Sequence, residues 1–284
     1  MNQPDPYRAA RDFHAAVDHK PSWLSIAAGF LAVEIVFMLS GALIVAPVAE
    51  VAGSTVTTLV LMASFAFLGA TAFWLASRVQ RRSPATLFGP PGAALRDGIL
   101  AAKGPFVLFF TLSVLPPWNY SGFSLNMAPV AWALLLPLSL VVVLIQTGAE
   151  EVVYRGWLQQ SLARISPSPV IWMVLPSVLF GVAHWSPEMP RDAAAAYVIW
   201  AIFFGIACAD LTARTGTLGA ALGFHFVTNL FSIVITSLEG FGDGLALFTI
   251  PEALARSEVN SITLVFDLFY LWMGWMACRI ALRR

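Results

Sequence analysis

The stretch LLLPLSLVVVLIQTGAEEVVYRGW, residues 134–157, joins an apolar run to two glutamates and an arginine, Glu150, Glu151 and Arg155. A helix needs about 20 apolar residues to span the ~30 Å hydrocarbon core of a bilayer, so the run is typical of a membrane span. A charge near the bilayer centre costs about 2.5–3.5 kcal/mol on insertion scales. Three charges at the end of such a span therefore indicate a specific role, provided that they lie inside the membrane.

The composition of the whole chain supports a membrane protein. Of its 284 residues, 58% are hydrophobic and 11% are charged. Soluble domains contain about 25% charged residues, so this chain has too little polar surface for a water-soluble globule. The net charge is zero, which gives no indication of a nucleic-acid partner. Cys208 and Cys278 lie in apolar segments without metal-ligand spacing, and we interpret both as small buried hydrophobic residues.

The apolar segments predict an all-α fold, a polytopic transmembrane bundle of about eight spans. Residues 1–21 read as a polar tail, and residues 22–284 as a single transmembrane domain. The first apolar run is longer than the 7–15 residues of a signal-peptide core, so we expect an uncleaved first helix. The predicted spans are residues 22–48, 54–77, 99–116, 129–152, 169–185, 193–212, 217–237 and 260–280.

The basic residues predict the orientation of these spans, because cytoplasmic loops carry an excess of lysine and arginine. With eight spans, only Arg191 and Arg256 fall on one side. The other fourteen of the sixteen basic residues fall on the opposite side, which predicts that both termini are cytoplasmic. The longest outer segment, residues 238–260, mixes apolar and acidic residues, and we expect it to lie along the outer surface.

Two histidines, His184 and His225, lie inside predicted spans. In a soluble core a lone histidine is most often structural, but ionisable groups inside a membrane usually face a cavity and mark function. His225 and Asn229 are four residues apart and therefore lie on one helix face. Glu34 and Asp267 also lie inside spans, with no charged partner at helical spacing.

The two adjacent glutamates are predicted to have different neighbours. Glu151 and Arg155 are four residues apart, with the acid first, which is the favourable order for a helical ion pair. Glu150 points about 100° away from Glu151 and is free to face another group. For Glu150 to meet His184, the fourth helix must continue through EEVVYRGWLQQSL, residues 150–162, and carry these charges into the membrane.

Three motifs in this half of the chain resemble those of a known family. They resemble the motifs of the CAAX prenyl protease and bacteriocin-processing family of intramembrane endopeptidases, and the resemblance covers about residues 128–235. One such motif alone would carry no information, but the ordered set is specific. In this chain the motifs read Glu150-Glu151-x-x-x-Arg155, Phe180-x-x-x-His184 and His225-x-x-x-Asn229.

The resemblance implies hydrolysis of a peptide bond in a peptide or a membrane-associated protein. It implies that Glu150 and His184 hold and deprotonate a water molecule, while His225 and Asn229 donate hydrogen bonds to the oxyanion. These residue types suit those roles, because hydrolysis needs a general base and a set of oxyanion donors. The small, alanine-rich chain suggests a bacterial inner membrane protein, and its oligomeric state stays open.

Several alternatives remain at this level. The resemblance implies a supporting, structural role for Glu151 and Arg155. It also implies a glutamate mechanism, which needs no cofactor. Two histidines and a glutamate are also a catalytic zinc set, although the HExxH spacing is absent and asparagine is a poor zinc ligand. A transporter would also use buried glutamates and histidines, but two related halves are not evident. A non-catalytic immunity or scaffold protein could keep the same fold.

Overall fold

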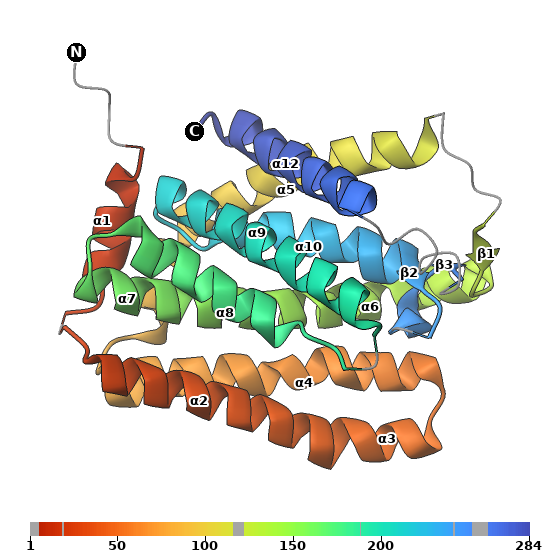
Figure 1. Ribbon diagram of the computed structural model, residues 1–284, viewed down its shortest axis with the longest axis horizontal. Helices are drawn as coiled ribbons and strands as arrows, with labels where there is room; N and C mark the ends of the chain where they lie inside the picture. Colours follow the sequence, from red (N-terminus) through yellow and green to blue (C-terminus); the bar gives the residue numbers. More distant parts are fainter. Residues whose placement is uncertain (1–5, 19, 116–121, 188, 241, 252–260) are drawn as a thin grey trace.

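Helices that run back and forth along one common direction make up almost all of the chain (Figure 1). The computed structural model describes residues 6–18, 20–115, 122–187, 189–240, 242–251 and 261–284. Within these residues, six helices are long and apolar enough to cross a membrane, and two shorter apolar helices accompany them. The predicted all-α polytopic bundle is confirmed. The described parts of the two terminal regions lie toward the same end of the bundle (Figure 1).

The first half of the chain forms a short helix and three long helical segments. These elements are α1 (Arg8–Ala15), α2 (Trp23–Ser40), η1 (Gly41–Val45), α3 (Ala46–Val51), α4 (Ser54–Trp74), η2 (Leu75–Val79), η3 (Pro84–Leu87) and α5 (Pro91–Val114). The second half contains α6 (Pro129–Glu151), η4 (Val152–Gln159), α7 (Gln160–Ile165), η5 (Val170–Val174), α8 (Leu175–Ala183), α9 (Arg191–Thr215), α10 (Gly219–Asn229), η6 (Leu230–Ile235), η7 (Asp243–Leu245) and α12 (Ser261–Leu282).

Two helices are longer than the sequence predicts. The third span was expected over residues 99–116, but α5 begins at Pro91, a residue favoured in the first turn of a helix. Its polar first turns are accommodated because the buried side chain of Asp97 accepts a hydrogen bond from Thr217. The fourth span was expected to end near residue 152, but the apolar helical segment that starts at Pro129 continues to Ile165.

Helices α5 and α10 approach each other through small residues. A Cβ atom at Gly223 would meet the carbonyl oxygen of Gly98, so only glycine fits at this contact. Small residues at helix interfaces in membranes allow the close backbone approach that dispersion forces need. This contact fixes the position of α10, the helix that carries His225 and Asn229.

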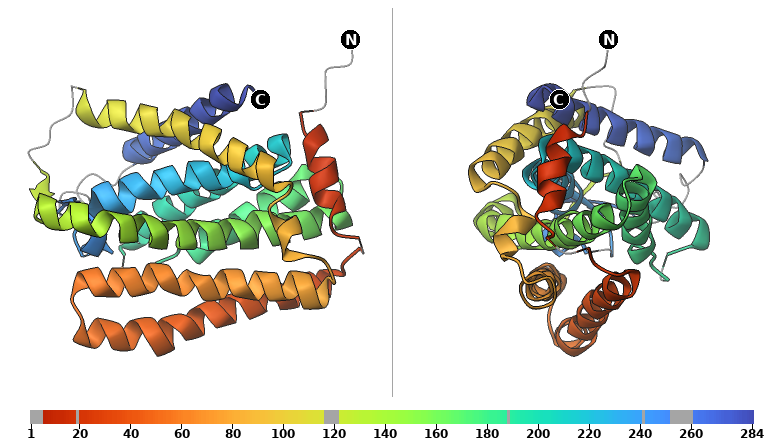
Figure 2. Two further views of the ribbon diagram at one scale, coloured as in Figure 1. Left: turned by 180° about the vertical axis from the view of Figure 1, so that it is seen from behind. Right: turned by 90° about the vertical axis from the view of Figure 1, so that its left-hand side faces the viewer.

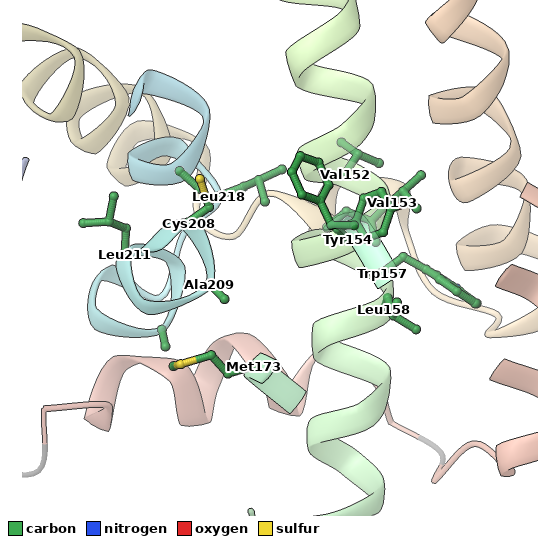
Figure 3. Packing of buried hydrophobic residues seen from close by; sticks show 14 of the residues in the cluster. Val152, Val153, Tyr154, Trp157, Leu158, Met173, Cys208, Ala209, Leu211 and Leu218 are labelled. Atoms are coloured by element: carbon green, nitrogen blue, oxygen red, sulfur yellow. The ribbon is translucent and has the colours of Figure 1, made fainter. Parts of the chain in front are cut away.

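The hydrophobic core surrounds the segment η4. The apolar side chains of η4 and residues of α9 belong to one cluster; those from η4 are Val152, Val153, Tyr154, Trp157 and Leu158 (Figure 3). Trp157 is buried, and a Cβ atom at Gly29 of α2 would meet its indole ring at 2.7 Å. Helix α2 therefore rests on η4 at a position where only glycine leaves room for the tryptophan.

Helix α1 lies across the end of the bundle (Figure 2, right). The segment that contains it was expected to be a polar tail, yet Phe13 is buried and the Tyr7 hydroxyl donates a hydrogen bond to Asp210 over 2.8 Å. His14 packs edge-on against Trp172 with ring centroids 5.1 Å apart. Burial lowers the pKa of His14 to about 4, so its imidazole is neutral at pH 7.

A small sheet lies at the opposite end of the bundle (Figure 1). Its strands are β1 (Ser124–Leu125), β2 (Thr236–Leu238) and β3 (Phe248–Ile250), in the order β1-β3-β2. β3 pairs antiparallel with β1 and parallel with β2. The segment expected along the outer surface therefore partly folds back onto the bundle, where η7 packs against α4.

Candidate active site

The two glutamates and the arginine of the opening stretch lie inside the bundle. Helix α6 passes without interruption into the π-helical segment η4, so Glu150, Glu151 and Arg155 are carried into the core. Their relative exposures are 5%, 0% and 1%, respectively. The continuation of the fourth helix, on which the sequence argument depended, is thus present. π-Helical turns within α-helices are rare and are found frequently at functional sites.

Glu151 is the centre of a buried network. Its Oε1 atom accepts a hydrogen bond from Nη1 of Arg155 over 2.9 Å, which is the predicted ion pair. The same oxygen lies 2.7 Å from Nδ1 of His225. Because an ionised carboxylate only accepts, this contact places a hydrogen on Nδ1 of the imidazole. Arg155 also donates to the carbonyl oxygen of Gly205, so both its terminal nitrogens have acceptors.

Glu150 lies on the other side of His225. Its Oε2 atom is 3.4 Å from Nε2 of the histidine. Among the described residues, this buried oxygen has no hydrogen-bond partner. A buried carboxylate oxygen without a partner carries a desolvation cost, and it is an open acceptor for a water molecule or a substrate group.

His184 lies at the end of α8 and is held through one ring nitrogen. Its Nδ1 atom is 2.7 Å from the carbonyl oxygen of Phe180, so this nitrogen carries a hydrogen and donates it. The Nε2 atom is then the one available to a ligand or a water molecule. Within the described residues, the ion pairs of Glu150 involve His225 and not His184.

Phe180 precedes His184 by one helical turn, and its ring packs against three of the predicted site residues. Its ring is 1% exposed, and its centroid lies 4.4 Å from that of His184. The guanidinium carbon of Arg155 lies 4.7 Å from the same centroid, within the range of a cation–π interaction. The ring of His225 is 6.0 Å away in an edge-on arrangement. Phe180 is therefore a common wall for three of the predicted polar residues.

Asn229 has a partner that the sequence argument missed. Its Nδ2 atom donates a hydrogen bond to Oε1 of Gln146 over 2.8 Å. Gln146 is 5% exposed and precedes Glu150 by four residues, so both lie on one face of α6. This helical spacing within a span was the available signal. The contact fixes the amide of Asn229 and leaves its second N–H for another acceptor.

Histidine and glutamate side chains that could bind zinc are present, but among the described residues they do not surround a common point. Among the described residues, no three His, Cys, Asp or Glu side chains converge on a position that could hold a metal. A catalytic zinc site needs three protein ligands around one point, and we therefore derive no step through a metal.

Fold and site together define the class of the protein. It is a multi-pass membrane protein in which buried and half-buried acidic, imidazole and amide groups from α6, α10 and the end of α8 lie around Phe180 and His225 inside the helical bundle. Ionisable groups in such positions are expensive and generally functional.

Comparisons with known proteins agree with the motifs. A family model described as type II CAAX prenyl endopeptidase Rce1-like matches residues 131–231, which include all six predicted site residues. YyaK, an uncharacterized protein of Bacillus subtilis (strain 168), is 30% identical over 217 residues, which cover 70% of this chain and 70% of that protein. No solved structure matches the chain. The chain belongs to the Rce1-like type II CAAX prenyl endopeptidase family, which implies an intramembrane protease activity.

Proposed function

We propose that this protein is an intramembrane endopeptidase of the glutamate type, which cleaves a peptide or a membrane-associated protein without a metal cofactor. The observation that carries the proposal is the buried carboxylate of Glu150, which lies beside His225 and, unlike Glu151, has no lysine or arginine partner among the described residues. In a chain with few charges inside its helices, such an acceptor is best explained by a reactant that binds there.

In the proposed reaction, Glu150 and Nε2 of His184 hold a water molecule between them. Glu150 removes a proton as the water oxygen attacks the carbonyl carbon of the substrate. His225, with hydrogens on both nitrogens, donates from Nδ1 to Glu151, while its Nε2–H and the free N–H of Asn229 donate to the developing oxyanion. The proton held by Glu150 then passes to the leaving amide nitrogen, and the C–N bond breaks.

The surroundings support this division of roles. Glu151 is occupied by Arg155 and His225, so it orients the imidazole and balances the buried guanidinium. The bundle is proposed to lie in a bacterial cytoplasmic membrane with both termini on the cytoplasmic side, where most basic residues fall. The partners are then the lipid bilayer and a peptide or protein substrate, with no role for nucleic acid.

The proposal is tested with the purified full-length protein and a library of hydrophobic peptides, read by mass spectrometry. Wild type is expected to cleave, and a folded Glu150→Gln variant is expected to show no cleavage above background. Equal cleavage by both proteins would contradict Glu150 as the base. No cleavage by wild type, with the protein folded in liposomes, would favour a non-catalytic membrane protein.

A further inference from the structure

Glu34 is a second carboxylate close to the proposed site, and no part of the mechanism above uses it. It is the twelfth residue of the apolar segment Trp23–Val51, roughly 17 Å along the helix from its start. Glu150 lies fifteen residues from Ile165, roughly 22 Å from the same end of the bundle. The two carboxylates therefore lie at similar depth.

Tyr154 connects Glu34 to the site. The Tyr154 hydroxyl donates a hydrogen bond to Oε1 of Glu34 over 3.3 Å. The tyrosine ring is 3% exposed and packs edge-on against Phe30 and Phe180. Tyr154 also follows Glu150 by four residues, about one helical turn. The bundle thus holds the half-buried carboxylate of Glu34 in a fixed place beside the wall formed by Phe180.

Glu34 differs from Glu151 in what balances its charge. Glu151 has Arg155 at 2.9 Å, and the two terminal nitrogens of that guanidinium donate to Glu151 and to the carbonyl oxygen of Gly205. In the part of the chain that the structure describes, Glu34 forms no ion pair with lysine, arginine or histidine. A single phenol hydroxyl leaves most of the carboxylate's acceptor capacity unused. A cation that paired with Glu34 would therefore come from another molecule or from a part of the chain outside the described residues.

We infer that Glu34 binds a positively charged group of the substrate, a lysine or arginine side chain close to the scissile bond. This inference rests on the proposed protease function. A carboxylate at this depth, fixed by Tyr154 beside Glu150, would bind an ammonium or guanidinium group while the neighbouring peptide bond reaches the water on Glu150. The apolar surroundings strengthen such a charge pair relative to water.

The test starts from a peptide that wild type cleaves. In each member of the series, one position around the cleavage site is replaced in turn by lysine, glutamine or glutamate. At one position, wild type is expected to prefer lysine over glutamine by roughly 10- to 100-fold in kcat/KM, the range for a hydrogen bond to a charged group. Glu34→Gln is expected to abolish this preference, so that the lysine and glutamine peptides are cleaved with equal kcat/KM. Glu34→Lys is expected to favour the glutamate peptide.

Asp267→Asn is the matched control. Asp267 is also a carboxylate inside a span, but it lines a separate cavity beside α5 and α12 together with Phe109 and Tyr270. This variant is expected to keep the lysine preference. Glu34→Asp, which keeps the charge, serves as a second variant if Glu34→Gln fails to fold, and its preference is expected to be reduced but present.

The outcomes separate the inference from the function on which it rests. Cleavage by wild type that is equal for lysine and glutamine at every position would overturn the role of Glu34. A lysine preference that survives in folded Glu34→Gln would do the same. If wild type cleaves no peptide of the series or the wider library, the protease function itself is contradicted. The inferred role of Glu34 in substrate binding is then contradicted as well.

Discussion

Nδ1 of His225 lies 2.7 Å from Oε1 of Glu151, an oxygen that also accepts a hydrogen bond from Arg155. On the other side of the ring, Nε2 lies 3.4 Å from Glu150. A single imidazole therefore lies between two adjacent glutamates that differ in their charged neighbours. Glu151 is balanced by a buried arginine, whereas Glu150 has no lysine or arginine partner among the described residues, and the Oε2 atoms of both glutamates have no hydrogen-bond partner there.

This difference predicts unequal effects of two similar substitutions on stability. Glu151→Gln leaves Arg155 as a buried cation without a carboxylate, which costs about 3–5 kcal/mol. Glu150→Gln removes a carboxylate whose one charged neighbour among the described residues is His225 at 3.4 Å, so it should lower the free energy of unfolding by less than Glu151→Gln does. Thermal unfolding of the purified variants in one detergent measures both. Equal destabilisation by the two substitutions would contradict the different environments described here.

The contact between Gln146 and Asn229 predicts a positioning effect on turnover. Asn229→Ala should lower kcat by about 10²–10³-fold, the range for loss of one oxyanion donor, with little change in KM. Gln146→Leu removes the acceptor that orients Asn229 and should lower kcat by roughly tenfold or more.

The two effects are expected to overlap rather than add. The double variant should be no slower than Asn229→Ala alone, because Gln146 acts through that side chain. Ser232→Ala, an exposed position on the same helical segment as Asn229, is the control and should behave as wild type. Additive losses in the double variant would show that Gln146 has a separate role.

The arrangement of ligands predicts that proteolysis is insensitive to chelators. With no three-ligand cluster among the described residues, activity should be unchanged after prolonged treatment with 1,10-phenanthroline and removal of the chelator. The measurement is the initial cleavage rate together with the metal content of the purified protein. Loss of activity that stoichiometric zinc restores would instead support the zinc alternative.

The close contact of α5 with α10 predicts a strong effect of a small apolar substitution. Gly223→Ala places a methyl group against the carbonyl oxygen of Gly98, which belongs to the backbone and has little freedom to move. We expect destabilisation of about 1–3 kcal/mol and a lower kcat, because α10 carries His225. Gly92→Ala, where a Cβ atom meets nothing within 4 Å, is the control and should not lower the melting temperature.

The neutral, buried imidazole of His14 predicts that docking of α1 depends on pH. The pKa of His14 is lowered by burial from 6.5 to about 4. Unfolded or undocked chains bind a proton more readily, so this contribution to docking is fully present above pH 6.5 and is lost as the pH falls toward 4.

Hydrogen exchange of the α1 amides, corrected for the intrinsic pH dependence, measures this effect. Protection should fall between pH 7 and pH 5 in wild type. His14→Phe keeps an aromatic ring against Trp172 and removes the titrating group, so its protection should not change over that range. The same loss of protection in this variant would assign the pH dependence to another group.

The amino-acid sequence alone determined the features that depend on local spacing and composition. Runs of about 20 apolar residues predict the spans because lipid offers no partner for exposed backbone groups. The ion pair of Glu151 with Arg155 follows from a separation of four residues on one helix. The separation of four residues also places Gln146 on the same helix face as Glu150, but the sequence does not show that Asn229 is the partner of Gln146.

Only the tertiary structure decided which faces of different helices meet. The contacts of His225 with Glu151, of Asn229 with Gln146 and of Tyr154 with Glu34 join residues 74, 83 and 120 positions apart. Such contacts depend on how far a helix continues, on rotation about its axis and on the glycines that let neighbouring helices approach. Those quantities result from packing of the whole bundle, and the hydropathy of a single segment does not contain them.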